Sequence, residues 1–90
     1  MSMQIGSQTV TLNVKVQGNT QIITFQAQIT AFNGQQLNEP QTITVQISCS
    51  TTKTVTQLVN GQPQSQTVQV TPEECVQNWL KAHEKIYTWR

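Results

Sequence analysis

Charged residues are scarce in this 90-residue chain, and aspartate is absent. Between residues 1 and 71 the only charged side chains are Lys15, Glu39 and Lys53, and the other six lie within the last 18 residues. The net charge is +1, and the five cations are dispersed, which is too few for strong binding to the phosphates of a nucleic acid. We therefore expect no nucleic-acid partner.

Long apolar runs and export signals are also missing. No stretch of 18 apolar residues occurs, and the N-terminus shows neither a basic segment nor an apolar segment of signal-peptide length. We therefore expect no membrane-spanning helix, no secretory signal and no membrane partner. The sequence does not assign a compartment.

The residue patterns that usually carry catalysis are absent too. There is no Cys-x-x-Cys pair, no serine in a nucleophile-elbow or phosphate-loop context, and one histidine, His83. His83 follows Cys75 by eight residues, which on a helix is about 12 Å, too far for a shared proton or metal. The side-chain carboxylates are Glu39, Glu73, Glu74 and Glu84. We expect no enzymatic activity, no cofactor and no metal.

Glutamine and threonine, by contrast with charged residues, are abundant. The chain contains 16 Gln and 14 Thr, so these two types make up 30 of its 90 residues. Their side chains give a neutral, hydrogen-bonding surface, which salt affects little and which offers many groups able to pair across a contact. Such a surface suits a stable assembly, and it equally fits a compositional bias without any partner.

Alternating apolar and polar residues predict strands along most of the chain. In residues 9–17 every second residue is apolar, which is typical of a half-buried strand. A two-residue turn at Gly18-Asn19 would pair this strand with the next one, with Val10 opposite Ala27 at the far end. The expected strands cover residues 8–17, 20–32, 41–50, 52–59 and 65–71, with a loop at 33–40 long enough to cross between sheets.

At Thr71 the period of the pattern changes from strand to helix. Thr71 as N-cap, Pro72 at the first helical position and Glu74 at the third satisfy three preferences for a helix start. Over residues 72–88 the apolar side chains then fall in one arc, which includes Trp79. The sequence therefore predicts an amphipathic C-terminal helix that packs on the sheet.

Together these segments predict one domain, residues 1–90, of the mainly β (α+β) class. About five antiparallel strands would form a curled sheet or a small β-sandwich with the helix packed on it. Because one helix covers only two to three strands, the rest of the apolar face needs a second sheet or another copy of the chain. Segments 51–56 and 64–69 carry no charge except Lys53, which leaves their edges open to strand pairing.

The two cysteines allow three interpretations. Cys49 lies on a predicted strand, and Cys75 lies in the first turn of the predicted helix. They are two buried thiols, a disulfide that joins strand to helix, or a pair in which Cys75 is reactive at the helix N-terminus. The spacing does not choose among these.

Four residues are candidates for contact with a partner. Trp89 lies on the polar side of the helical arc, where it is either tucked against the sheet or exposed as an anchor, with Tyr87 two residues before it. Thr54 and Gln66 lie in the open-edged segments, where added charges would disturb strand pairing.

The leading hypothesis is a non-enzymatic structural protein that forms a homo-oligomer or joins a larger assembly. The composition is similar to that of many virion components of phages and archaeal viruses, which would place the chain in a virion or the host cytoplasm as a capsid decoration, connector or tail accessory protein. One alternative is a soluble binding module or inhibitor that docks on a host protein through Trp89, Tyr87 or residues 51–69. Another is an extracellular adhesive domain, which requires a disulfide between Cys49 and Cys75.

Overall fold

The computed structural model describes residues 1–90 and is mainly β, with one short helix. Its elements are β1 Ser2–Ile5, β2 Gln8–Thr11, β3 Asn13–Gln17, β4 Thr20–Phe32, β5 Gln35–Ser50, β6 Thr52–Val59, β7 Gln62–Gln69, α1 Pro72–Ala82 and β8 Tyr87–Trp89. The strands pair antiparallel in three sheets: β1–β2, a central sheet β3-β4-β5 in which β8 also pairs with β4, and β6–β7. The predicted fold class is confirmed, although the strands do not form one curled sheet.

The first predicted strand is divided into two. Its second half is β3, which pairs with β4 in the expected register but stops where Asn13 lies opposite Thr24. The predicted pairing of Val10 with Ala27 is therefore wrong, because β2 leaves the central sheet and pairs with β1 instead. Val10 and Leu12 still point into the core, where they are 2% and 3% exposed, so the apolar alternation is satisfied by a strand that lies over the sheet.

The predicted crossover loop at residues 33–40 is also wrong. Asn33 and Gly34 have φ angles of 51° and 79°, which is the backbone geometry of a tight hairpin turn, so β5 begins directly at Gln35. The register between β4 and β5 shifts between Ile29 and Ala31, where β5 carries additional residues that include Pro40. The result is a long hairpin with a bulge near its closed end.

Helix α1 begins at Pro72 and ends earlier than residue 88. The hydroxyl of Thr71 accepts a hydrogen bond from the Glu74 backbone N–H at 3.2 Å, as in an N-cap. The helix ends at Ala82, and Tyr87–Trp89 form β8 on the edge of β4, so the predicted helical end is wrong. Aromatic and β-branched residues favour strands, and here a neighbouring strand offers them backbone partners.

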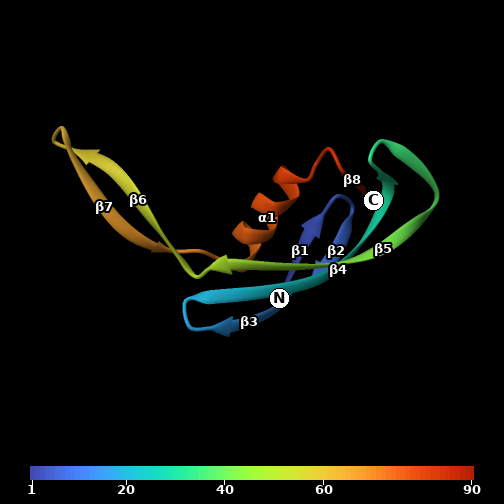
Figure 1. Ribbon diagram of the computed structural model, residues 1–90, viewed down its shortest axis with the longest axis horizontal. Helices are drawn as coiled ribbons and strands as arrows, with labels where there is room; N and C mark the ends of the chain where they lie inside the picture. The colour runs from blue at the N-terminus through green and yellow to red at the C-terminus, as the bar shows by residue number, and fades with distance from the viewer.

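The core lies on one face of the central sheet, where α1 and the β1–β2 hairpin pack side by side (Figure 1). This small hairpin supplies the second cover that one helix could not provide. The buried residues of the core are Ile5, Val10, Leu12, Ile23, Phe25, Ala27, Val45, Ile47, Cys75 and Val76. The opposite face carries polar side chains such as Gln26, Thr44 and Gln46, which are exposed.

Candidate interaction surface

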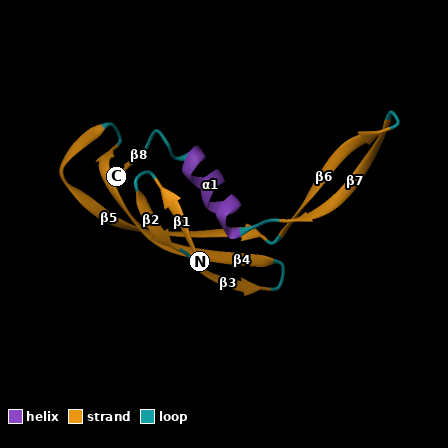
Figure 2. Cartoon of the chain, turned by 180° about the vertical axis from the view of Figure 1, so that it is seen from behind, coloured by secondary structure: helices purple, strands orange, loops and turns teal.

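Strands β6 and β7 form a hairpin that extends away from the rest of the domain, and we call residues 52–69 the arm (Figure 2). The molecule measures 56 × 29 × 18 Å, and the arm occupies one end of the long axis. Every residue of β6 is exposed, and Val68 is the one residue of β7 that is half-buried. The arm therefore contributes little to the core of its own chain.

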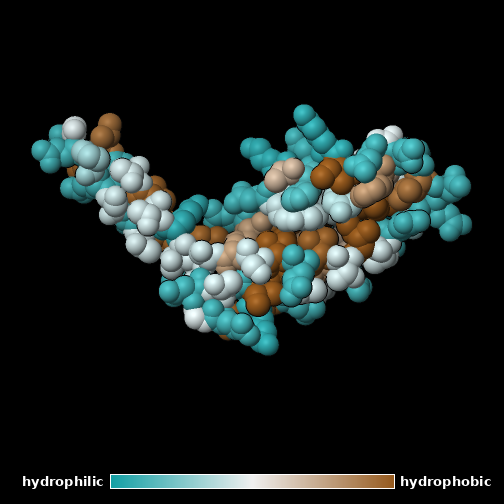
Figure 3. All heavy atoms as spheres, viewed as in Figure 1, coloured by the Kyte–Doolittle hydropathy of each residue, from teal (hydrophilic) through white to brown (hydrophobic).

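The arm exposes several apolar side chains among its Thr and Gln residues (Figure 3). Val55, Leu58 and Val59 are 40%, 74% and 39% exposed. An isolated two-stranded hairpin is at best marginally stable in water, because it has no second layer to bury its side chains. A hairpin with exposed valine and leucine gains stability when another surface covers it.

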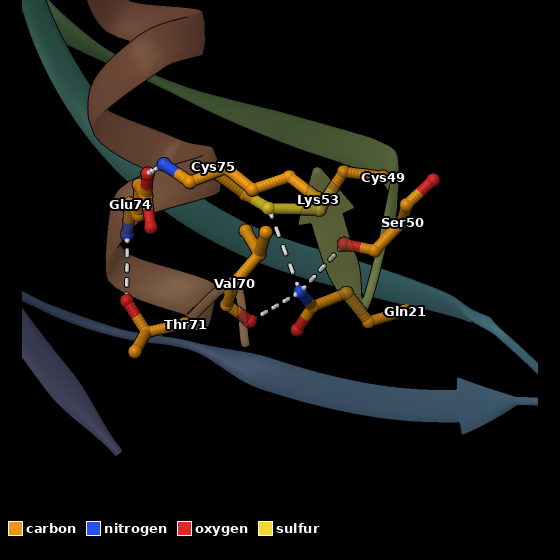
Figure 4. A network of polar contacts seen from close by, with 8 residues as sticks. All are labelled: Gln21, Cys49, Ser50, Lys53, Val70, Thr71, Glu74 and Cys75. Carbon is orange, nitrogen blue, oxygen red and sulfur yellow. Dashed lines mark hydrogen bonds and ion pairs between the residues drawn. A yellow bond between two sulfur atoms is a disulfide. The ribbon is translucent and has the colours of Figure 1, made fainter. Parts of the chain in front are cut away.

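Hydrogen bonds and a disulfide hold the base of the arm to the domain (Figure 4). Gln21 on β4 is 3% exposed, and its side-chain N–H groups donate to the carbonyl oxygens of Val70 at 3.0 Å and Ser50 at 3.3 Å. These two carbonyls belong to the segments that enter and leave the arm. Cys49 and Cys75, just outside them, are joined by a disulfide with Cα atoms 6.6 Å apart.

An ion pair adds a further tie at the same place. Lys53, the only charged residue of the arm, pairs with Glu74 in the first turn of α1. Both side chains are partly exposed, so this pair adds little to stability by itself. Its effect is to direct the single charge of the arm back toward the domain, which leaves the rest of the arm neutral.

The structure leaves no free thiol in the chain, because both cysteines are in the disulfide. The structure therefore agrees with the second of the three interpretations, the disulfide, and contains no reactive Cys75 thiol.

The role of Gln21 at the base of the arm was not predicted. The available signal was a polar residue at an inward position of an otherwise apolar alternation.

The four candidate contact residues lie in two separate places. Thr54 and Gln66 are exposed on the arm, with Thr54 opposite Thr67 and Gln66 opposite Val55, which puts them on different faces of the hairpin. Tyr87 and Trp89 lie in β8, near the other end of the domain (Figure 1). The fold thus does not bring the two pairs together.

Tyr87 and Trp89 belong to an aromatic cluster built around Trp79. The Trp79 ring lies 5.8 Å from that of Tyr87, 6.1 Å from that of Trp89 and 4.2 Å from that of His83, all measured between centroids. Phe25 meets Trp79 edge-on at 6.2 Å from the core side. Tyr87 and Trp89 are both half-buried, so much of their surface is already used within the chain.

His83 is fixed at the end of the helix by the same cluster. Its ring stacks on Trp79, and its Nδ1 lies 2.7 Å from the Trp79 carbonyl oxygen. Because a carbonyl oxygen can only accept, Nδ1 carries the proton and donates this bond. His83 therefore serves to terminate α1.

No group of three His, Cys, Asp or Glu side chains is arranged to hold a metal ion. The surface has two open hollows, one along residues 36–41 of β5 and one between β2, β4 and β5, and both are lined mostly by polar residues. No helix has the length and apolar character needed to cross a membrane.

Comparison with models of protein families, with curated proteins and with solved structures found no match. The candidate interaction surface is the exposed arm.

Proposed function

We propose that this chain is a non-enzymatic structural protein that assembles with copies of itself, and that the arm makes the contact. The observation that supports this proposal is a hairpin whose residues are all exposed except Val68 and whose base is held by a disulfide and hydrogen bonds. A hairpin of this kind gains little within its own chain. Burial against another chain would stabilise it.

The character of the arm surface favours a stable assembly over a transient encounter. Lys53, which pairs with Glu74, is the only charged residue of the arm, so no other charge must be removed from water when the arm is covered. Threonine and glutamine side chains can form hydrogen bonds across the contact, and Val55, Leu58 and Val59 add apolar area. The compositional similarity to phage and archaeal virus particles makes a virion the proposed setting.

Absolute mass in solution, measured by light scattering over a concentration series, tests this function. We expect a discrete oligomer for the native chain, and a shift toward monomer for a variant with Thr54→Lys and Gln66→Lys, because lysines on the arm discourage its pairing with another chain. The matched control adds the same charge on the exposed face of α1 with Gln77→Lys and Asn78→Lys. A native chain that stays monomeric at every concentration would refute self-assembly.

The disulfide supports a second candidate, an extracellular adhesive domain, because disulfides persist in oxidising surroundings. Such a domain would be retained on a cell surface. The soluble binding module would be a monomer, and pull-down of one dominant partner that is lost in Trp89→Ala would identify it. The mass in solution therefore separates the binding module from the assembly.

A further inference from the structure

Strands β5 and β6 follow each other directly, and each has one free edge. At Thr51, the bend that joins them, the backbone N–H donates to Asn19 O at 2.9 Å and the backbone C=O accepts from Val70 N at 2.9 Å. Strand β5 pairs with β4 and strand β6 pairs with β7. No strand pairs with the other edge of either.

The alternation of the ladders identifies the unpaired groups. In β6–β7 the pair Val59 and Gln62 closes a two-residue turn, so odd-numbered residues of β6 bond to β7, consistent with the bond at Thr51. The same alternation makes odd-numbered residues of β5 bond to β4. The backbone N–H and C=O groups that face outward then belong to Thr42, Thr44, Gln46, Ser48, Thr52, Thr54, Thr56 and Leu58, whereas the carbonyl oxygen of Ser50 already accepts from the Gln21 side chain.

These two free edges lack the features that usually prevent strand pairing. From residue 41 to residue 59 the chain contains no proline, and its only charge is Lys53, which is engaged by Glu74. The ladder of β5 with β4 is regular from Gln41 to Ser50. The other free edges are less suitable, because β3 has five residues and includes Lys15, and β7 includes Pro63.

We infer that the free edges of β5 and β6, residues 42–58, pair antiparallel with the same edges of a second copy, so that the arm of each copy extends the central sheet of the other. The inference rests on the proposed self-assembly and names its contact. The two segments match in length, since β6 has eight residues and the regular part of β5 has ten. Strand β6 follows β5 directly in each copy. When the arm of one copy pairs antiparallel with β5 of the other, two-fold symmetry therefore places the arm of the other copy on β5 of the first.

The faces of the two copies also match in this pairing. The residues whose backbone groups face the other copy are even-numbered on both strands, so even-numbered residues lie opposite each other. Side chains alternate between the two faces of a sheet, so the odd-numbered side chains of both copies lie together on the other face. Val55 and Val59 would then continue the apolar face that holds Val45 and Ile47. The even-numbered side chains, which are Thr, Ser and Gln apart from Leu58, would meet on the polar face. A two-fold axis near Ser50 would superpose the bends that both copies have at Thr51.

Distances between identical spin labels test the pairing. The native cysteines are bonded to each other, so Ser50→Cys and Gln57→Cys each provide one labelling site. We expect the two Ser50 labels within about 20 Å of each other and the two Gln57 labels roughly 40 to 50 Å apart, because strands rise about 3.3 Å per residue from the axis. Pairing of arm with arm would reverse this order, and a head-to-tail contact would separate the Ser50 labels; either result would overturn the inference.

A proline at Gln46 provides an independent test. Gln46→Pro removes an outward N–H that the ladder of β5 with β4 does not use, so the chain is expected to fold. At concentrations where both chains are monomeric, its urea stability is expected to equal that of the native chain. We expect the dissociation constant of the dimer to rise at least tenfold, and Gln46→Ala, which keeps the N–H, to change it little. A native monomer would reject the proposed function as well. A native oligomer that Gln46→Pro leaves intact would reject only this pairing.

Discussion

The disulfide between Cys49 and Cys75 closes a loop that contains the whole arm. The two residues are 26 positions apart, and a cross-link over such a loop reduces the entropy of the unfolded chain by an amount worth about 3.5 kcal/mol in the chain-entropy model. A domain of this size is stable by roughly 5 to 13 kcal/mol in total. The bond therefore contributes between about a quarter and three quarters of the expected stability of the fold.

We predict that the double variant Cys49→Ala and Cys75→Ala unfolds in urea with a free energy lower by about 3.5 kcal/mol, and with a steeper denaturant dependence because its unfolded chain is less compact. Cys75 is 6% exposed, so the variant also loses packing of the sulfur atom. The native sequence unfolded in a reducing agent keeps both sulfurs and serves as the control. A decrease below about 1 kcal/mol in both experiments would refute the assigned role of the loop.

Two further predictions concern single residues, and urea unfolding checks both. Gln21→Leu should lower the free energy of unfolding by about 1 to 3 kcal/mol, because two carbonyl oxygens at the base of the arm lose their donor, whereas Gln17→Leu on exposed β3 should change it little. Gly6→Ala should be more destabilising than Gly18→Ala: both have φ near +60°, but a Cβ at Gly6 would lie 2.4 Å from the Arg90 carbonyl oxygen, whereas Gly18 has open space. Equal effects within either pair would contradict these assignments.

The features that were predictable from the sequence depend on neighbouring residues. The turn at Gly18-Asn19 and the register of β3 with β4 follow from residues at most a few positions apart. The start of α1 follows from Thr71 and Pro72, whose preferences act within one helical turn. The arm was expected as two strands with open edges, since its pattern has few apolar residues and almost no charge.

The features that were not predictable depend on distant partners. Residues 83–88 fit the pattern of a helix, but β4 offers backbone hydrogen bonds near Phe32, and these favour a strand over further helical turns. The sequence of β2 fits equally well a continuation of the hairpin between β3 and β4. In the structure β2 pairs with β1 instead and packs its apolar residues on the core face of the central sheet. The position of Gln21 beneath Val70 and Ser50 requires knowledge of where the chain returns from the arm.

The disulfide, the hydrogen bonds of Gln21 and the ion pair of Lys53 all lie at the base of the arm, and their position indicates their structural role. A surface loop of this length needs no disulfide, buried glutamine and ion pair to remain attached, because the cost of a longer loop grows slowly with its length. These contacts instead fix the direction in which the arm leaves the domain. An arm held in one direction loses less conformational entropy when it binds, so that more of its contact energy appears as affinity. For the proposed self-assembly, the same reasoning gives the disulfide a part in association in addition to its part in stability, since it holds the base of the arm, where β5 passes into β6.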